Sequence, residues 1–389
     1  MKIKWFFYVF LAILLILVLF LGINSYVDYS SKPNLPDVLV GVDVAYDGVE
    51  DIKNIVDEVK SYTSFFVVGS TGITYNVTKL SEVCQYIYDS GLYFGIFAHP
   101  TIRFNQSQWV SDARQRWSSR FFGLYAFDEF GGSQIDRFQV NNETYMLVPE
   151  ANDWTDAADK YVEKLNRVLS YFRVDWNVGD FPLFTSDYAL YEFDYRAGYD
   201  VVLAEFAWNH SRPLNVALCR GAATLRNKDW GVMITYTYDT PPYIESGPEL
   251  YNDMVMAYQN GARYIVVFDY AKDPATNSTH GILQQEHIDA LKRFWQYIKE
   301  HPRTNNATDD RVAYVLPRDY GYGFRGPNDT IWGLWDANNL SSKIWNDVST
   351  LVEQYKPRLD IIHEDSLQFS TYNYSKLIFW NGTTVTNSK

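Results

Sequence analysis

Two glutamates interrupt otherwise apolar runs of this 389-residue chain. Glu129 lies in LYAFDEFGG and Glu205 lies in VVLAEFAWN. A buried carboxylate is costly unless it is paired, titrates or binds something, so these two positions are the first candidates for chemistry. Two carboxylates that flank a sugar can cleave a glycosidic bond, because one protonates the leaving oxygen while the other attacks the anomeric carbon or activates water. We therefore take Glu129 as the candidate acid and Glu205 as the candidate nucleophile or base, with Asp239 in reserve for the second role.

Other polar and aromatic side chains follow apolar runs in the same way. As candidates for substrate binding we take Asp43, His99, Asp128, Trp208, Tyr236, Asp269 and Tyr270. Carboxylates gathered at one rim would raise each other's pKa values. Some of these positions have a plainer alternative, since Asp128 is also a suitable helix cap and His99 is also a suitable core histidine. Gly131 and Gly132 would let the backbone come close to a ligand.

The elements that must position these residues alternate between β-like and helix-like runs over residues 37–302. Eight runs have the pattern of buried strands, and each is followed by a helical run. The predicted strands are Val38–Asp47, Ser64–Ser70, Tyr93–Pro100, Phe121–Gly132, Pro182–Ala189, Val201–His210, Gly231–Asp239 and Ala262–Tyr270. Eight such units predict an α/β fold of the (β/α)8 TIM-barrel type, whose active site lies at the C-terminal ends of the strands. A doubly wound open sheet is the alternative, although that fold has no need of eight units.

Residues 303–389 have a different pattern and follow the polar linker TNNATDD. Three further runs, at Arg311–Pro317, Arg358–Asp365 and Lys376–Gly382, are predicted strands, with an amphipathic helix between the first two. This order predicts a small, flavodoxin-like α/β domain. The stretch DYGYGFRGPND is interpreted as an ordered loop, because no helix follows it directly as a phosphate cradle requires.

With this order of elements the chain resembles the (β/α)8 glycoside hydrolases. In the large retaining clan of that fold the acid/base Glu follows strand four, as Glu129 does here, so the resemblance implies a hydrolase that acts on a glycan. The clan usually has Asn before this Glu, where the chain has Asp128. After strand seven the clan has its nucleophile Glu, and the chain offers Asp239 there.

The C-terminal segment from RVAYVLP to KLIFWNG is similar to the amidotransferase-like domain that follows the barrel in family 42 β-galactosidases. It contains no Cys, because Cys84 and Cys219 both lie in the predicted barrel, and this excludes amidotransferase chemistry. A catalytically inactive barrel that binds glycan or serves as a structural surface protein is the alternative to a glycosidase.

Composition removes several classes of function. Acidic residues outnumber basic ones by 47 to 34, for a formal net charge of −13, and no basic patch offsets this, so a general nucleic-acid binder is excluded. Two cysteines cannot form a four-thiolate zinc site, and the six histidines form no HExxH or His-x-His pair. We predict neither a metal nor a cofactor, and the sequence does not specify an oligomeric state.

The segment Trp5 to Ile23 is 19 residues long and carries no charge. As a helix it would span roughly 28 Å, about the thickness of the hydrocarbon core. A cleaved signal peptide is the alternative, but no A-x-A site follows the segment. Because Lys2 and Lys4 precede the segment, the positive-inside rule places the N-terminus in the cytoplasm. The predicted organisation is therefore a cytoplasmic tip and single-pass signal-anchor at residues 1–25, a linker at 26–36, the barrel at 37–302 and the small domain at 303–389, with both domains outside the cell membrane.

Asn-x-Ser/Thr sequons are spread over the chain after this segment and fit an N-glycosylated extracytoplasmic protein. Together with the low cysteine content they suit an archaeal cell surface. The ten candidate glycosylation sites are Asn76, Asn105, Asn142, Asn209, Asn277, Asn306, Asn328, Asn339, Asn373 and Asn381.

We expect the protein to stay with membranes after a carbonate wash, because the uncharged segment is long enough to cross the bilayer. Protease added outside intact cells should digest the C-terminal domain. A soluble mature chain that begins near Ser25 would contradict this prediction.

Overall fold

The computed structural model describes residues 36–137, 139–140, 143–144, 146–270, 281–303, 310–368 and 374–387. Contacts within the chain separate Met1–Asp37 from one larger unit, Val38–Lys389, to which the elements below belong. The predicted anchor, residues 5–23, lies outside the described residues. Within the described ranges, no helix has both the length and the apolar character needed to span a bilayer.

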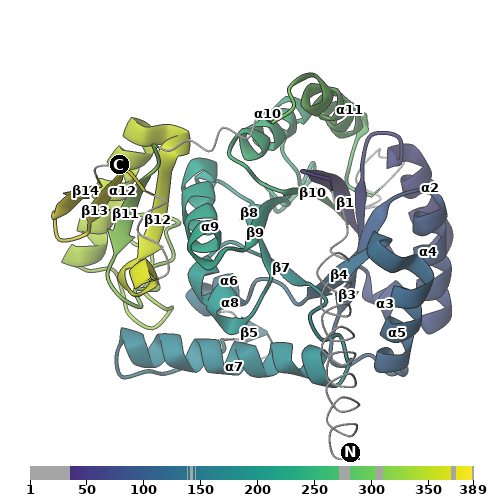
Figure 1. Ribbon diagram of the computed structural model, residues 1–389, viewed down its shortest axis with the longest axis horizontal. Helices are drawn as coiled ribbons and strands as arrows, with labels where there is room; N and C mark the ends of the chain where they lie inside the picture. Colours follow the sequence, from purple (N-terminus) through teal and green to yellow (C-terminus); the bar gives the residue numbers. More distant parts are fainter. Residues whose placement is uncertain are drawn as a thin grey trace, which may run out of the picture. The chain divides into compact units, whose positions relative to one another are not determined.

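Eight parallel strands close into a barrel, which confirms the predicted fold (Figure 1). Strand β1 pairs with both β2 and β10, and this closes the sheet. The doubly wound alternative is therefore wrong. The barrel strands are β1 (Leu39–Ala45), β2 (Phe65–Val68), β3 (Tyr93–Ala98), β4 (Phe121–Ala126), β7 (Leu183–Asp187), β8 (Val201–Phe206), β9 (Asp229–Ile234) and β10 (Tyr264–Tyr270).

Helices follow the strands and cover the outside of the barrel (Figure 1). After β4 the chain forms the short helix α6 and the two-stranded hairpin β5 (Gln139–Val140) and β6 (Glu143–Thr144) before the long helix α7. The helices are α2 (Val49–Val59), α3 (Thr71–Thr74), α4 (Val77–Asp89), α5 (Gln106–Trp117), α6 (Phe130–Asp136), α7 (Trp154–Val174), α8 (Tyr191–Ala197), α9 (Arg212–Arg226), α10 (Gly247–Gln259) and α11 (Gln285–Glu300).

Aromatic rings fill the inside of the barrel below its polar mouth. Phe122 packs against Phe65, Phe184 and Tyr264, with ring centroids 5.7, 5.9 and 5.2 Å away. Gly41 leaves room for this layer, because a Cβ there would lie 2.0 Å from the carbonyl oxygen of Phe65. The barrel interior is thus a packed core, and polar side chains gather where the strands end.

Seven of the eight barrel strands end before the predicted residue, three of them by four residues or more. Strand β4 stops at Ala126 rather than Gly132, β8 at Phe206 rather than His210, and β9 at Ile234 rather than Asp239. Left-handed backbone follows two of them, with φ of 54° at Glu129 and 42° at Trp208. Such φ values cannot continue a strand, so Glu129 and Trp208 lie on the loops above the barrel.

The C-terminal residues form a separate sheet in the order β12-β11-β13-β14. Its strands are β11 (Val312–Leu316), β12 (Leu359–His363), β13 (Lys376–Phe379) and β14 (Thr384–Thr386), and only β14 is antiparallel to its neighbour. One long helix, α12 (Asn339–Tyr355), connects β11 to β12, whereas a short 3-10 segment at Glu364–Gln368 follows β12. The parallel order matches the predicted pattern, but the unit is a small sheet rather than a complete flavodoxin-like domain.

Helix α9 packs against the barrel on one side and against β12 on the other (Figure 1). The two backbones come close at Gly221, where a Cβ would lie 2.4 Å from the carbonyl oxygen of Ile361. Beside it, Arg220 donates hydrogen bonds to Asp360 Oδ1 at 2.6 Å and to the carbonyl oxygen of Leu359 at 2.7 Å. Asp360 is fully buried and also accepts a hydrogen bond from the Tyr374 hydroxyl at 3.0 Å. A buried ion pair therefore joins the barrel to the C-terminal sheet.

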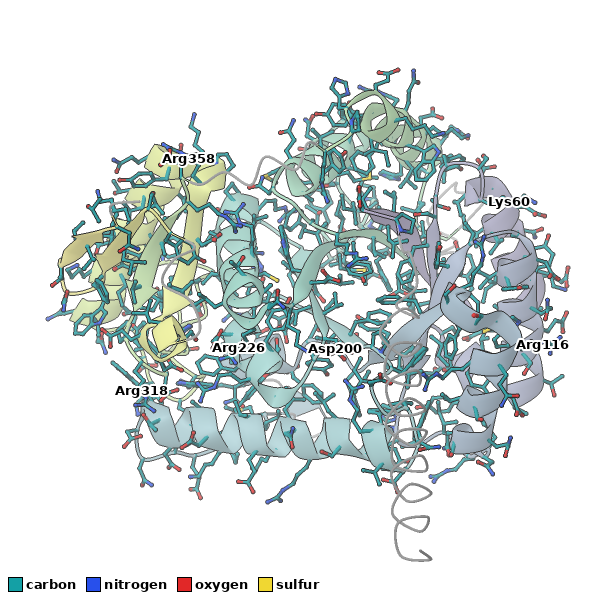
Figure 2. All side chains as sticks on the ribbon, viewed as in Figure 1. Lys60, Arg116, Asp200, Arg226, Arg318 and Arg358 are labelled. Carbon is teal, nitrogen blue, oxygen red and sulfur yellow. The ribbon has the colours of Figure 1, made fainter. Side chains whose placement is uncertain are left out.

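We expect Arg220→Met to lower the free energy of unfolding by about 3 kcal/mol, because it leaves the buried carboxylate of Asp360 with incomplete compensation. The matched control is Arg358→Met. Arg358, labelled in Figure 2, forms an ion pair with Asp310 in which the side chains are 44% and 65% exposed. This control should change stability by less than about 1 kcal/mol. Urea unfolding measures both, and equal losses would contradict the assigned role of Arg220.

Candidate active site

The structure brings Glu129 and Glu205 to the C-terminal end of the barrel, close enough that the charge of Glu129 raises the pKa of Glu205. Glu205 lies on β8, is 3% exposed, and its Oε1 accepts a hydrogen bond from the Ser186 hydroxyl at 2.6 Å. Glu129 lies directly before α6 and approaches from the adjoining loop. Two carboxyls that interact electrostatically do not both ionise readily, so the protonation of one depends on the charge of the other.

Burial gives this pair an unusual titration. Burial is the largest cause that raises the pKa of Glu129, to about 7, and the charge of Asp128 is the second cause. Burial also raises the pKa of Glu205 well above its usual value, followed by the charge of Glu129. Because the two groups interact strongly, they titrate as one unit. Near neutral pH the pair keeps one proton, as a general acid beside an ionised carboxylate requires.

Asp187 at the end of β7 holds the turn that carries Glu129. Its carboxylate accepts hydrogen bonds from the backbone N–H groups of Gly131 at 2.6 Å and Gly132 at 2.8 Å. The backbone N–H of Glu129 donates to the carbonyl oxygen of Ser186 at 2.9 Å. The two glycines therefore approach a buried carboxylate of the protein, and not a ligand as the sequence analysis allowed. Asp187 is 1% exposed and acts by positioning Glu129.

Tyr125 and Ser186 form a second positioning group inside the barrel, which the sequence did not indicate. The Tyr125 hydroxyl on β4 and the Ser186 hydroxyl lie 2.6 Å apart, and Ser186 in turn donates to Glu205. The Tyr125 ring stacks on Phe184, with the centroids 5.3 Å apart. No local pattern distinguishes these residues from core residues, because their hydrogen bonds connect different strands.

Asp43 and Asp128 bring two more carboxylates to the mouth. Asp43 on β1 is 2% exposed, and its Oδ1 has no hydrogen-bond partner among the described residues. Burial, followed by the charge of Asp128, raises the pKa of Asp43 well above its usual value. Asp128 is open to water, yet it is surrounded by enough protein that desolvation raises its pKa too. In the described part of the chain neither Asp43, Asp128 nor the glutamate pair forms an ion pair with Lys or Arg, so the mouth is acidic.

The remaining candidates form the rim of the mouth. His99 follows β3, is half-buried, and its ring lies 4.9 Å from that of Phe127. Burial lowers the pKa of His99 and favours its neutral form. On the other side Trp208 is 36% and Tyr270 is 50% exposed. Tyr236 follows β9, with its ring centroid 5.8 Å from that of Phe268 on β10.

Two candidates occupy different positions from those predicted. Asp269 is fully buried and accepts hydrogen bonds from the Tyr46 hydroxyl and from the backbone N–H of Ile282 at 2.8 Å. It therefore holds the segment before α11 in place, and burial raises its pKa to about 6. Asp239 is exposed on the loop between β9 and α10, and the carboxylate paired with Glu129 is Glu205.

A loop of the C-terminal unit contributes to the wall around α6. Gln134 on α6 is fully buried, and its amide donates to the carbonyl oxygens of Val148 at 2.9 Å and Trp332 at 2.8 Å. Asp136 at the end of α6 forms an ion pair with Arg325 and accepts a hydrogen bond from the Tyr188 hydroxyl. The predicted ordered loop thus reaches the helix that begins next to Glu129, a contact that sequence spacing could not indicate.

Six of the ten sequon asparagines lie in the described ranges, and all six are exposed: Asn76, Asn105, Asn209, Asn328, Asn339 and Asn381. The other four, Asn142, Asn277, Asn306 and Asn373, lie outside those ranges. Glycosylation stays a prediction. Cys84 and Cys219 are free and buried, and no cluster of His, Cys, Asp or Glu suited to a metal ion occurs among the residues that are described.

No protein-family model and no curated protein sequence matches the chain. Solved structures do resemble it. A GH5_18 protein from Streptomyces cattleya in complex with GlcNAc is 10% identical, with a TM-score of 0.56 over 89% of this chain and 99% of that chain. A β-galactosidase from the psychrophilic Marinomonas ef1 is also 10% identical, with a TM-score of 0.51 over 88% of this chain and 72% of that chain. At this level of identity the likeness shows the fold.

We expect the free energy of unfolding to fall between about pH 5 and about pH 8, because the folded state keeps carboxyl protons that the unfolded chain releases. The pKa of Glu129 rises from 4.5 in the unfolded chain to about 7 in the folded protein. Glu205→Gln should make this loss smaller, since it removes a carboxyl whose pKa the fold raises well above its usual value.

Urea unfolding at several pH values measures the slope. Glu353→Gln, on the exposed surface of α12, is the control and should leave the slope unchanged. A Glu205→Gln protein with the slope of the unchanged chain would contradict the raised pKa of Glu205.

Proposed function

We propose that the barrel hydrolyses glycosidic bonds in a glycan, with Glu129 as general acid and Glu205 as nucleophile. The observation that carries this proposal is the pair of electrostatically coupled carboxyls in a buried, acidic mouth. One member keeps its proton near neutral pH, and the other is aimed into the barrel by Ser186. The glycoside hydrolases among the structural neighbours support the choice, because they show that the fold accommodates this chemistry.

The closeness of the pair favours retention of configuration. Inverting enzymes hold their carboxyls ~6.5–9.5 Å apart to admit water, whereas retaining enzymes hold them ~5–5.5 Å apart. We favour the retaining outcome for Glu129 and Glu205, because the charge of Glu129 acts on Glu205 strongly enough to raise its pKa. A sugar that enters between them would meet Glu129 at the glycosidic oxygen and Glu205 at the anomeric carbon.

The reaction then has two balanced steps. A carboxylate oxygen of Glu205 bonds to the anomeric carbon while the bond to the leaving oxygen breaks, and the proton of Glu129 moves to that oxygen. In the second step Glu129, now ionised, takes a proton from water as the water oxygen bonds to the anomeric carbon and Glu205 is released. Asp187 keeps Glu129 in place through both steps.

The rim residues would bind the sugar. We assign hydroxyl contacts to Asp43 and Asp128, because the unpartnered Asp43 Oδ1 can hydrogen-bond a hydroxyl. Half-buried His99 and the exposed rings of Trp208 and Tyr270 would contact the faces of the sugar. Tyr236 would add a further aromatic contact to the sugar, and Asp269 would hold the segment before α11 in place.

The location of the protein is part of the proposal. An anchor at residues 1–25 would hold the barrel and the C-terminal unit outside the cell membrane, and the exposed sequons would carry glycans there. The uncharged segment and the six exposed asparagines support this arrangement. We also propose that the C-terminal unit is a reduced relative of the accessory domain of family 42 β-galactosidases, and that the chain comes from an archaeal surface.

An inactive, glycan-binding barrel is the second candidate function. The acidic residue that follows the seventh barrel strand favours this function. The retaining clan has its nucleophile there, whereas this chain has Asp239 on an exposed loop. The two candidates differ in whether any glycan is cleaved.

We expect Glu129→Gln to lower kcat/KM by ~10²-fold or more for glycosides with poor leaving groups, because the variant keeps the shape and removes the proton. An activated aryl glycoside should be affected much less, since its leaving group needs no proton. The ratio of the two effects is the measurement. Small, equal effects on both substrates would exclude Glu129 as the acid, and no cleavage of any glycoside by the unchanged protein would favour the binding function.

A further inference from the structure

An open cleft of about 640 Å³ lies between the loop after β8 and the loop after β9. This volume is within the ~300–1,000 Å³ range of ligand pockets. One wall begins at Trp208, three residues after Glu205, and the facing wall includes Thr237 and Tyr238. The ring of Trp208 meets that of Tyr188 edge-on, with the centroids 5.7 Å apart, and the charge of Glu129 acts on the Tyr188 hydroxyl. Trp208 thus connects the cleft along the chain to Glu205, and through Tyr188 to the neighbouring Asp187, which holds the turn of Glu129.

The backbone of Trp208 is strained in a way that presents its ring to the cleft. Its φ of 42° is unusual for a bulky side chain, and such conformations persist only where neighbouring groups hold them. Here the Trp208 N–H donates to the carbonyl oxygen of Tyr236 at 2.8 Å, and the Trp208 carbonyl accepts from Arg212 at 3.0 Å. The indole remains 36% exposed, and Tyr238 across the cleft is 45% exposed. Two partly exposed aromatic side chains thus line the cleft and can contact a ligand that enters it.

The floor of the cleft is polar and rigid. The guanidinium of Arg212 forms ion pairs with Asp253 at 3.0 Å and Glu245 at 3.3 Å, and it donates to the carbonyl oxygen of Ala207 at 2.8 Å. Glu245 is 5% exposed, and burial, followed by the charge of Asp253, raises its pKa to about 8. The guanidinium of Arg212 is therefore already ion-paired with carboxylates of the protein. The exposed carboxylate of Glu249 adds negative charge to the lining of the cleft.

We propose that this cleft binds the sugar ring next to the one held by Glu129 and Glu205, and that it takes uncharged sugars or amino sugars and excludes uronic acids. The inference rests on the proposed function of the pair. The rings of Trp208 and Tyr238 would contact the apolar faces of the sugar, and the fixed carboxyls would accept hydrogen bonds from its hydroxyl or amino groups. A uronic acid would bring a charge to a site whose arginine is already paired, and like charges at close range repel.

Titration calorimetry with the full-length Glu129→Gln protein tests binding without turnover. The protein is made without N-glycosylation, because the sequon Asn209 lies on the cleft wall. The probes are β-1,4-linked hexamers of glucose, mannose, N-acetylglucosamine and glucosamine, with hexagalacturonate as the anionic probe. At least one of the first four should bind, and hexagalacturonate should not. Adding Tyr238→Ala should weaken binding ~10-fold or more, the scale of a lost aromatic anchor, while Tyr238→Phe keeps the ring and should change affinity less than ~2-fold.

Three outcomes would overturn the inference: binding of hexagalacturonate alone, no binding of any hexamer, or the same affinity in Tyr238→Ala and Tyr238→Phe. Failure of the proposed function has a different result. If the hexamers bind through Tyr238 and the unchanged protein cleaves none of them, the cleft stands as a binding site and the catalytic role of the pair falls. If aryl monosaccharide glycosides are cleaved and no hexamer binds, the catalytic role stands and the cleft is not a sugar site.

Discussion

The electrostatic coupling of Glu129 and Glu205 is the interaction on which the arrangement of the barrel mouth depends. Two ionised carboxylates close together repel each other strongly where water is scarce, so the pair favours keeping a proton. No Lys or Arg in the described structure forms an ion pair with either glutamate, so nothing of that kind relieves the repulsion. The Ser186 hydroxyl donates a hydrogen bond that orients Glu205, and the Asp187 carboxylate accepts backbone hydrogen bonds that hold the turn of Glu129.

The carboxylates of this protein thus divide into two kinds. Asp187 and Asp269 are satisfied by backbone N–H groups, and each fixes a loop above the barrel. Asp43, Glu129 and Glu205 accept no such backbone hydrogen bonds from the described residues, although burial raises the pKa values of all five carboxyls. The first kind holds the loops still, which is what allows the second kind to remain buried, close together and partly protonated.

The C-terminal unit takes part in the same construction. The Arg220–Asp360 pair fixes α9 to the edge strand β12, and the loop with Trp332 and Arg325 reaches the far side of α6. Helix α6 therefore has β7 on one side and this loop on the other. Since Glu129 directly precedes α6, the small sheet supports the candidate acid without contributing a residue to the mouth. This is a physical reason for the sheet to accompany the barrel.

The sequence by itself determined the eight strands, their order and the two glutamates that stand out in apolar runs. Those features are local: a strand buried on both faces needs a continuous apolar run, and a charge within one is visible at once. Only the tertiary structure decided that the partner of Glu129 is Glu205 and not Asp239, that Asp269 holds a loop, and that Asp187 and Ser186 position the pair. Each of these depends on which strand ends become neighbours and on left-handed turns that end a strand early. Sequence spacing carries no record of such contacts, because closing the barrel brings together side chains that are far apart along the chain.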